Sequence, residues 1–187
     1  MTAEEIIAAI AAAVPGATYQ ALVSADSAVT PTLGVPREHI VATCRALQAP
    51  GLEFVAFSDV TAVDFHPNRM PRFDLVYHLV SPHRRARVRL KVGINAQEAI
   101  ETLSTLYPGA GWPEREVYDL FGIVFDGHAD MRRIMMPDDW EGHPLRKDYP
   151  VQLRKDAQTF MPLQVSEEEF KANLERDRFQ RGSVKPK

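Results

Sequence analysis

The period of residues 86–92 constrains the fold more than any other feature of the chain. Four apolar positions alternate there with three cations: Ala86, Val88, Leu90 and Val92 against Arg87, Arg89 and Lys91. A period of two predicts a strand with one apolar and one cationic face. The cationic face suits either an acidic partner or solvent, where its charge also discourages edge-to-edge aggregation.

Other stretches supply the remaining elements of a two-layer fold. Helices are expected at about 3–13, from Pro36 to before Pro50, and at about 96–107, where Pro108-Gly109 ends the third. Further strands are expected at 17–24, 31–35, 52–64 and 73–80. The fold class is therefore α+β: a two-layer α/β domain over residues 1–112, with a mixed five-stranded sheet in the order α-β2-α-β3-α.

Composition narrows the class of protein. The chain has 187 residues, 45% of them hydrophobic and 25% charged, which suits one domain with a tail. A formal net charge of -3 argues against nucleic-acid binding. No apolar run approaches the roughly 20 residues of a membrane span, and the acidic start at Glu4-Glu5 is unlike a secretory signal.

The single cysteine, Cys44, limits redox chemistry. One thiol forms no internal disulfide, and an iron–sulfur cluster normally takes four thiolates. Cys44 lies on the apolar stripe of the expected second helix, which favours a small buried hydrophobe over a reactive thiol.

Residues 113–150 mix charges of both signs with aromatic residues, glycines and prolines. This mixture predicts a rigid but irregular segment, held by ion pairs and forming a partner interface. The residues assigned to this interface are Glu114, Arg115, Glu116, Asp119, Phe121, Gly122, His128, Asp130, Arg132, Arg133, Gly142, His143, Pro144, Arg146, Lys147 and Asp148.

Chemical alternatives for this segment are weaker. The chain has no dinucleotide fingerprint, phosphate-binding loop or nucleophile elbow. His128 and His143, helped by Asp130 and Asp148, form the rival hypothesis of a metal or acid/base site. The two histidines are 15 residues apart in the sequence, without the i, i+4 spacing of a helical metal motif.

The composition shifts after Pro150, and residues 151–187 read as a C-terminal extension. Ser166 and Glu169 form a possible capping box, which predicts a short helix over about 167–180. A helix with so few apolar groups either docks on a partner or frays.

The order of motifs in residues 114–150 resembles a known signature. The runs are Glu114-Arg115-Glu116-Val117-Tyr118-Asp119-Leu120-Phe121-Gly122-Ile123, His128-Ala129-Asp130-Met131-Arg132-Arg133-Ile134 and Gly142-His143-Pro144-Leu145-Arg146-Lys147-Asp148-Tyr149-Pro150. They resemble the C subunit (the 30 kDa-type subunit) of respiratory complex I, the proton-pumping NADH–quinone oxidoreductase. The phrase Asp59–Asp64 extends the resemblance over most of residues 1–150. Ala129 departs from it, because the family commonly has proline there.

The resemblance implies a non-catalytic core subunit of the peripheral arm that braces the quinone-reducing subunits. The complex is the enzyme, and this chain would hold no active site, cofactor or metal. FMN, iron–sulfur clusters and quinone would be held by other subunits, and the D, B and I subunits are the expected partners. The expected location is the cytoplasmic side of a bacterial inner membrane. A homologous subunit of a membrane-bound hydrogenase, or of another donor–quinone complex, is the alternative.

Overall fold

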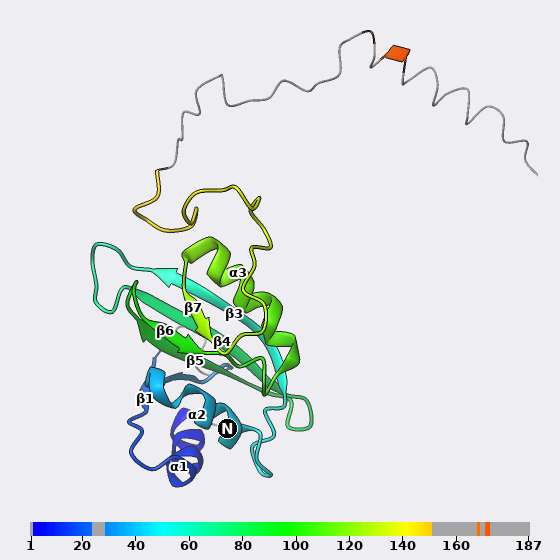
Figure 1. The fold of residues 1–187 in the computed structure, drawn as a ribbon. Coiled ribbons are helices and arrows are strands. Elements are labelled where there is room, and N and C mark those ends of the chain that lie inside the picture. Colours follow the sequence, from blue (N-terminus) through cyan, green and yellow to red (C-terminus); the bar gives the residue numbers. More distant parts are fainter. Residues whose placement is uncertain (1, 24–28, 151–167, 169–170, 173–187) are drawn as a thin grey trace, which may run out of the picture. The chain divides into compact units, whose positions relative to one another are not determined.

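The computed structural model describes residues 2–23, 29–150, 168 and 171–172. Met1–Pro150 form one compact unit (Figure 1). Its helices are α1 (Ala3–Ala13), η1 (Arg37–His39), α2 (Ile40–Leu47), η2 (Pro108–Ala110) and α3 (Gly111–Phe121), where η marks a 3-10 turn. Its strands are β1 (Gln20–Leu22), β2 (Thr32–Gly34), β3 (Ala56–Asp64), β4 (Phe73–Ser81), β5 (Ala86–Ile94), β6 (Ala99–Glu101) and β7 (Val124–Asp126).

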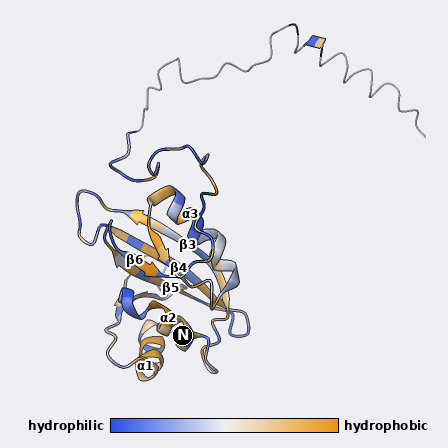
Figure 2. Cartoon of the chain, in the orientation of Figure 1, coloured by the Kyte–Doolittle hydropathy of each residue, from blue (hydrophilic) through white to orange (hydrophobic). Residues whose placement is uncertain are grey.

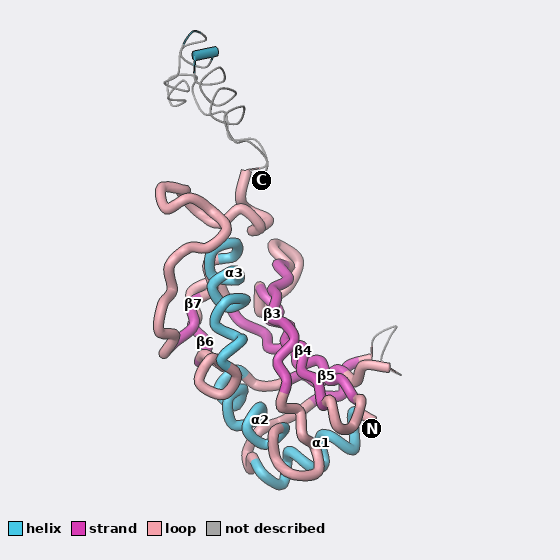
Figure 3. The backbone as a smooth tube through the Cα atoms, turned by 90° about the vertical axis from the view of Figure 1, so that its right-hand side faces the viewer, coloured by secondary structure: helices cyan, strands magenta, loops and turns pink. Residues whose placement is uncertain are grey.

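Five of the strands form one mixed sheet in the order β1-β2-β5-β4-β3. Strands β2 and β5 are parallel, and the other neighbours are antiparallel. The predicted α+β class with a mixed five-stranded sheet is confirmed. Strands β6 and β7 add a small parallel pair, and α3 runs beside β3 (Figure 3).

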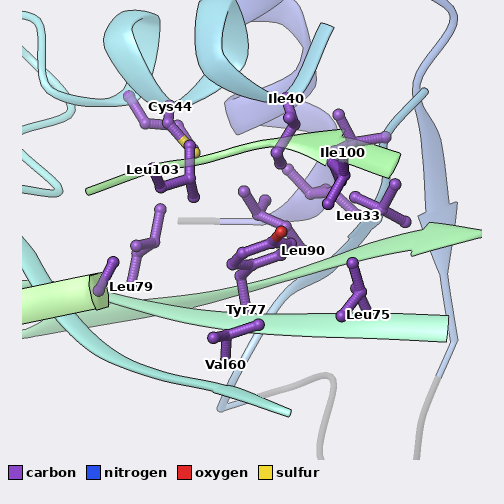
Figure 4. Packing of buried hydrophobic residues seen from close by; sticks show 14 of the residues in the cluster. Leu33, Ile40, Cys44, Val60, Leu75, Tyr77, Leu79, Leu90, Ile100 and Leu103 are labelled. Atoms are coloured by element: carbon purple, nitrogen blue, oxygen red, sulfur yellow. The ribbon is translucent and has the colours of Figure 1, made fainter. Parts of the chain in front are cut away.

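The alternation in β5 positions the core as its period predicts. Val88, Leu90 and Val92 are fully buried, and Leu90 lies opposite Tyr77 of β4. Figure 4 shows Cys44 of α2 over this face of the sheet. Cys44 is fully buried and burial raises the pKa of its thiol, so the prediction of a buried hydrophobe is confirmed.

The first helix begins as predicted. The Thr2 hydroxyl accepts a hydrogen bond from the Glu5 amide at 3.3 Å, and the Glu5 carboxylate accepts one from the Thr2 amide at 2.9 Å. This reciprocal capping box satisfies two donors that the helix itself leaves unpaired. Ile6 and Ile10 then turn into the core.

The helix predicted over residues 96–107 is wrong. A local turn does form, because the Glu98 carboxylate accepts from the Asn95 amide at 2.9 Å. The turn does not continue as a helix, because the next residues become strand β6 and pair with β7, with Ile100 opposite Phe125. Both of these side chains are buried in the core, so tertiary pairing outweighs the helical spacing.

The irregular backbone predicted from residue 113 onward is also wrong up to Phe121. Pro113 lies in the first turn of α3, where no amide donor is needed. Gly122 takes a left-handed φ of 75° at the C-cap, and its amide donates to the Tyr118 carbonyl at 2.8 Å. The supposed helix breakers are therefore the two ends of a helix. From Gly127 to Pro150 the described backbone has turns but no helix or strand.

A second unit spans Val151–Lys187. Of its residues the structure describes only Glu168, Lys171 and Ala172, which are helical and exposed. The predicted helix over 167–180 otherwise falls outside the described residues.

Candidate functional site: a wrapping segment along helix α3

Residues 127–150, here called the wrapping segment, lie alongside α3 and run parallel to it, from its first residue toward its last (Figure 3). Figure 2 shows that this segment is largely hydrophilic. Its contacts fall in sequence order: His128 at the start of α3, Arg132 and Arg133 near its middle, and His143 near its end. The segment is therefore attached along the whole helix.

The start of α3 is held by a buried carboxylate. Glu114 has no exposed surface, and it accepts from the Leu103 amide at 2.8 Å and from the Thr102 hydroxyl at 2.5 Å. Burial raises the pKa of this carboxyl above its usual value, although the two hydrogen bonds oppose the rise. The side chain links α3 to the end of β6.

His128 joins the wrapping segment to the same end of α3. Its Nδ1 accepts from the Asp130 amide at 3.0 Å, which leaves Nε2 to donate to the Gly111 carbonyl at 3.0 Å. Both ring nitrogens are therefore engaged by backbone groups. The Glu114 carboxylate lies 3.9 Å from Nε2, beyond hydrogen-bond distance.

Arg115 holds the next turn. Its Nε donates to the Arg132 carbonyl at 2.9 Å, and a terminal nitrogen donates to the Arg133 carbonyl at 3.1 Å. Asp130 forms a bidentate pair with Arg132 at 2.9 and 2.8 Å. The hydrogen bonds from Arg132 hold the pKa of Asp130 well below its usual range. Arg132 itself is highly exposed, so this last pair adds little stability.

Asp119 is the centre of the attachment. Its side chain is fully buried, and Oδ2 accepts three consecutive amides, those of Ile134, Met135 and Met136, at 3.0, 2.7 and 2.8 Å. Oδ1 accepts from Arg133 at 2.6 Å. Burial alone would raise the pKa of this carboxyl, but the amides and Arg133 together lower it. A single carboxylate thus fixes a turn that has no regular structure.

Near the end of α3, two rings of the wrapping segment pack directly on glycines. The His143 Nδ1 lies 2.9 Å from the Asp119 carbonyl, and its ring lies against Gly122. The Tyr149 ring similarly covers Gly142. A side chain at either glycine would displace the ring that covers it.

The wrapping segment then reaches the hairpin of β3 and β4. Arg72 forms bidentate pairs with Asp64, at 3.0 and 2.7 Å, and with Asp148, at 2.9 and 2.8 Å. Asp64 also accepts from the Lys147 amide at 2.8 Å. Although burial opposes it, the bonds from Arg72 and the amides hold the pKa of Asp64 far below its usual value. Sequence reasoning missed Asp64 and Arg72; the available signal was a carboxylate at an inward position of a strand, which needs a partner.

The remaining residues of the predicted interface contribute no side-chain hydrogen bond between α3 and the wrapping segment. Phe121 is buried with its ring edge-on to Phe73. Arg146 lies 3.7 Å from Asp148. Among the described residues, no hydrogen bond, ion pair or ring contact is formed by the side chains of Glu116, Pro144 and Lys147. Glu116 is exposed on the opposite side of α3 from Glu114, as expected for positions two apart on a helix.

The rival metal or acid/base site is contradicted. His128 lies at Gly111 and His143 at Gly122, and 11 residues of helix separate them by roughly 16 Å. No group of three or more His, Cys, Asp or Glu side chains suited to a metal occurs in the part of the chain that the structure describes. No described helix is long and apolar enough to cross a membrane.

Apolar side chains remain uncovered around this attachment. Trp112, Met135 and Leu145 are 64%, 61% and 50% exposed. Val124 and Ile134 are also exposed. Large apolar and aromatic groups beside arginines are the composition of protein interfaces.

Known proteins resemble the chain in sequence. Over 122 residues it is 50% identical to the NADH-quinone oxidoreductase C subunit of Geobacter sulfurreducens, an alignment that covers 65% of this chain and 75% of that relative. Over 123 residues it is 45% identical to the corresponding C subunit of Sinorhizobium medicae, covering 62% of this chain and 61% of that relative.

Solved structures resemble it in fold. A trypsin-resistant fragment (1–134) of Nqo5 is 30% identical with a TM-score of 0.54, covering 70% of this chain and 99% of the fragment. A chain of the membrane-bound sulfane sulfur reductase, an archaeal respiratory membrane complex, is 27% identical with a TM-score of 0.64, covering 79% and 85%. Residues 33–155 match the family described as respiratory-chain NADH dehydrogenase, 30 Kd subunit. That match spans more than half of the chain, and the chain therefore belongs to this family.

Proposed function

We propose that this chain is a structural core subunit of the peripheral arm of a proton-translocating NADH–quinone oxidoreductase, where it braces the quinone-reducing subunits. The observation that supports this role most is the attachment of the wrapping segment. Asp119, Arg115 and Asp64 are engaged by backbone groups of that segment, so they shape a surface and are not free to act on a substrate. Trp112, Met135 and Leu145 then offer apolar area beside it for a partner.

The partners in this proposal are the D subunit first and the B and I subunits next. Electron transfer would take place in other subunits, which would hold FMN, the iron–sulfur clusters and quinone. This chain would contribute contact surface and no redox centre. It would lie on the cytoplasmic side of the inner membrane, attached through its partners.

A discriminating experiment replaces Asp119 by alanine in the native complex. Loss of the three amide contacts and the Arg133 pair should loosen the wrapping segment. We expect less assembled complex in membranes and a parallel fall in NADH–quinone reductase activity, with unchanged activity per assembled complex. Normal assembly with lost quinone reduction would instead give Asp119 a catalytic role and contradict the proposal.

The electron donor is a separate question, because a chain of a sulfane sulfur reductase shares the fold at 27% identity. The second candidate is therefore a subunit of a related membrane-bound respiratory complex with another donor. Purification from native membranes and mass analysis of the co-purified chains decides between them. An NADH-oxidising, FMN-containing protein among those chains supports the first function, and a different donor-side enzyme supports the second.

A further inference from the structure

The outward face of β5 carries a cationic stripe that the wrapping segment does not use. Arg87, Arg89 and Lys91 point away from the core residues Val88 and Leu90. The turn before β5 adds exposed cations at Arg84 and Arg85. No acidic residue occurs from position 75 to position 97, although the chain as a whole has a net charge of -3. The positive charge is therefore concentrated locally on an acidic protein.

The neighbouring strands place an apolar or a small residue opposite each end of the stripe. Val80 lies opposite Arg87 on β4, and Gly34 lies opposite Lys91 on β2. Asp74, a carboxylate of β4 that lines the same side of the sheet, is already paired with Arg69. Among the described residues, Arg87 and Lys91 have no carboxylate partner.

A groove of about 410 Å³ lies at the Lys91 end of the stripe. Its floor includes Gly34 and Gly93, and the loop residues Met70 and Pro71 form a wall. A β-carbon on Gly93 would overlap the Pro71 ring, so the loop sits directly on that glycine. A β-carbon on Gly34 would make ordinary van der Waals contacts with Gln20 and Leu22, the nearest at 3.5 Å, so a substitution there adds volume to the floor without a clash at the β-carbon. The volume is within the usual range for ligand sites.

We propose that the outward face of β5 docks an extended acidic segment of another protein. Carboxylates four residues apart on a strand are separated by ~13.6 Å, the distance along β5 between Arg87 and Lys91. Such a segment would pair its carboxylates with Arg87 and Lys91 and place its next residues in the groove beside Gly34. A flat anionic membrane matches the charge but neither the repeat nor the groove. This surface is separate from the wrapping segment, so the proposal does not depend on the function proposed above.

The test uses the full chain and a fluorescein-labelled peptide of four Val-Glu repeats, followed by fluorescence anisotropy at low salt. The comparison peptide has the same composition with its valines and glutamates in separate blocks. We expect the alternating peptide to bind more tightly than the block peptide, and binding to weaken as salt rises. Arg87→Glu with Lys91→Glu should weaken binding about tenfold or more, because two attractions become repulsions. Gly34→Val, which fills the groove floor, should also weaken it.

Arg45→Glu is the matched control, because it makes the same kind of charge reversal at an exposed position of α2. It should leave peptide binding within about twofold of the original, since it lies away from the stripe. Equal weakening by the Arg45 variant and the β5 variant, equal binding of the two peptides, or no binding at all would overturn the proposal. So would charge-dependent binding to phosphatidylglycerol vesicles without peptide binding, which would assign the face to a membrane.

Discussion

The imidazole of His143 lies directly on Gly122, and a β-carbon at that glycine would lie 2.5 Å from the ring. The same glycine has a φ of 75° and ends α3. One position therefore both terminates the helix and receives the last part of the wrapping segment. The absence of a side chain at Gly122 permits both the left-handed φ and the close contact with His143, and mutations can distinguish these two effects.

Gly122→Ala should destabilise the fold by about 3 kcal/mol, the sum of a left-handed alanine and a displaced ring. Gly16→Ala is the control for the backbone term alone, because Gly16 has a φ of 93° and a β-carbon there would meet nothing within 4 Å. It should cost only about 1–2 kcal/mol. Urea unfolding followed by circular dichroism measures both. Equal losses would show that the His143 contact contributes nothing.

Asp119→Asn should cost roughly 3 kcal/mol, because it removes the negative partner of a buried ion pair and leaves the Arg133 guanidinium without a counter-charge. The amide also cannot replace the carboxylate as the acceptor of three backbone amides and an arginine. Asp130→Asn is the control, because it breaks an equally well-aligned pair with an exposed arginine. Its unfolding midpoint should change little. A similar loss in the two variants would contradict the central role of Asp119.

Strand periodicity predicted the sheet, because a half-buried strand has to place its apolar residues on one side. The third helix was misplaced because the helical spacing lies in one region, while the helix forms in another that carries apparent breakers. Residues 96–107 have the apolar spacing, and residues 111–121 have a proline and a glycine that look like breakers. Only the pairing of Ile100 with Phe125 decides between them, and that contact joins residues far apart in the sequence.

The charged composition of residues 113–150 indicated that ion pairs hold the segment. It did not indicate which pairs form, because geometry and burial select the partners. Asp64 and Arg72 lie outside the segment and yet anchor its end through Asp148 and the Lys147 amide. Glu114 and Glu116 are the same residue type two positions apart, but one is buried and the other is exposed.

The Asp64 carboxylate should make stability depend on acidic pH. Its pKa is lower in the folded protein than in the unfolded chain, so its contribution is complete above the unfolded value of about 3.9 and is lost as pH falls toward the folded value. The stability difference between the original protein and Asp64→Asn should therefore shrink below about pH 4. Urea unfolding from about pH 6 to about pH 2.5 measures it. Asp59→Asn, an exposed carboxylate on the same strand, is the control; the same trend in both variants would refute the assignment.

Glu114 should have the opposite effect, because burial raises its pKa in the folded protein. A carboxyl with a raised folded pKa favours folding below its unfolded value of about 4.3 and loses that advantage as pH rises through the folded value. Glu114→Gln keeps an acceptor for the Leu103 amide, presents an amide donor to the Thr102 oxygen in place of an acceptor, and has no charge to bury. Its stability relative to the original protein should therefore increase from about pH 4 to about pH 8 in urea unfolding. Glu116→Gln removes an exposed carboxylate from the same helix and serves as the control. An increase of equal size in both variants would show that the burial of Glu114 is not its cause. A decrease in Glu114→Gln alone would mean that the buried carboxylate stabilises the fold in its charged form.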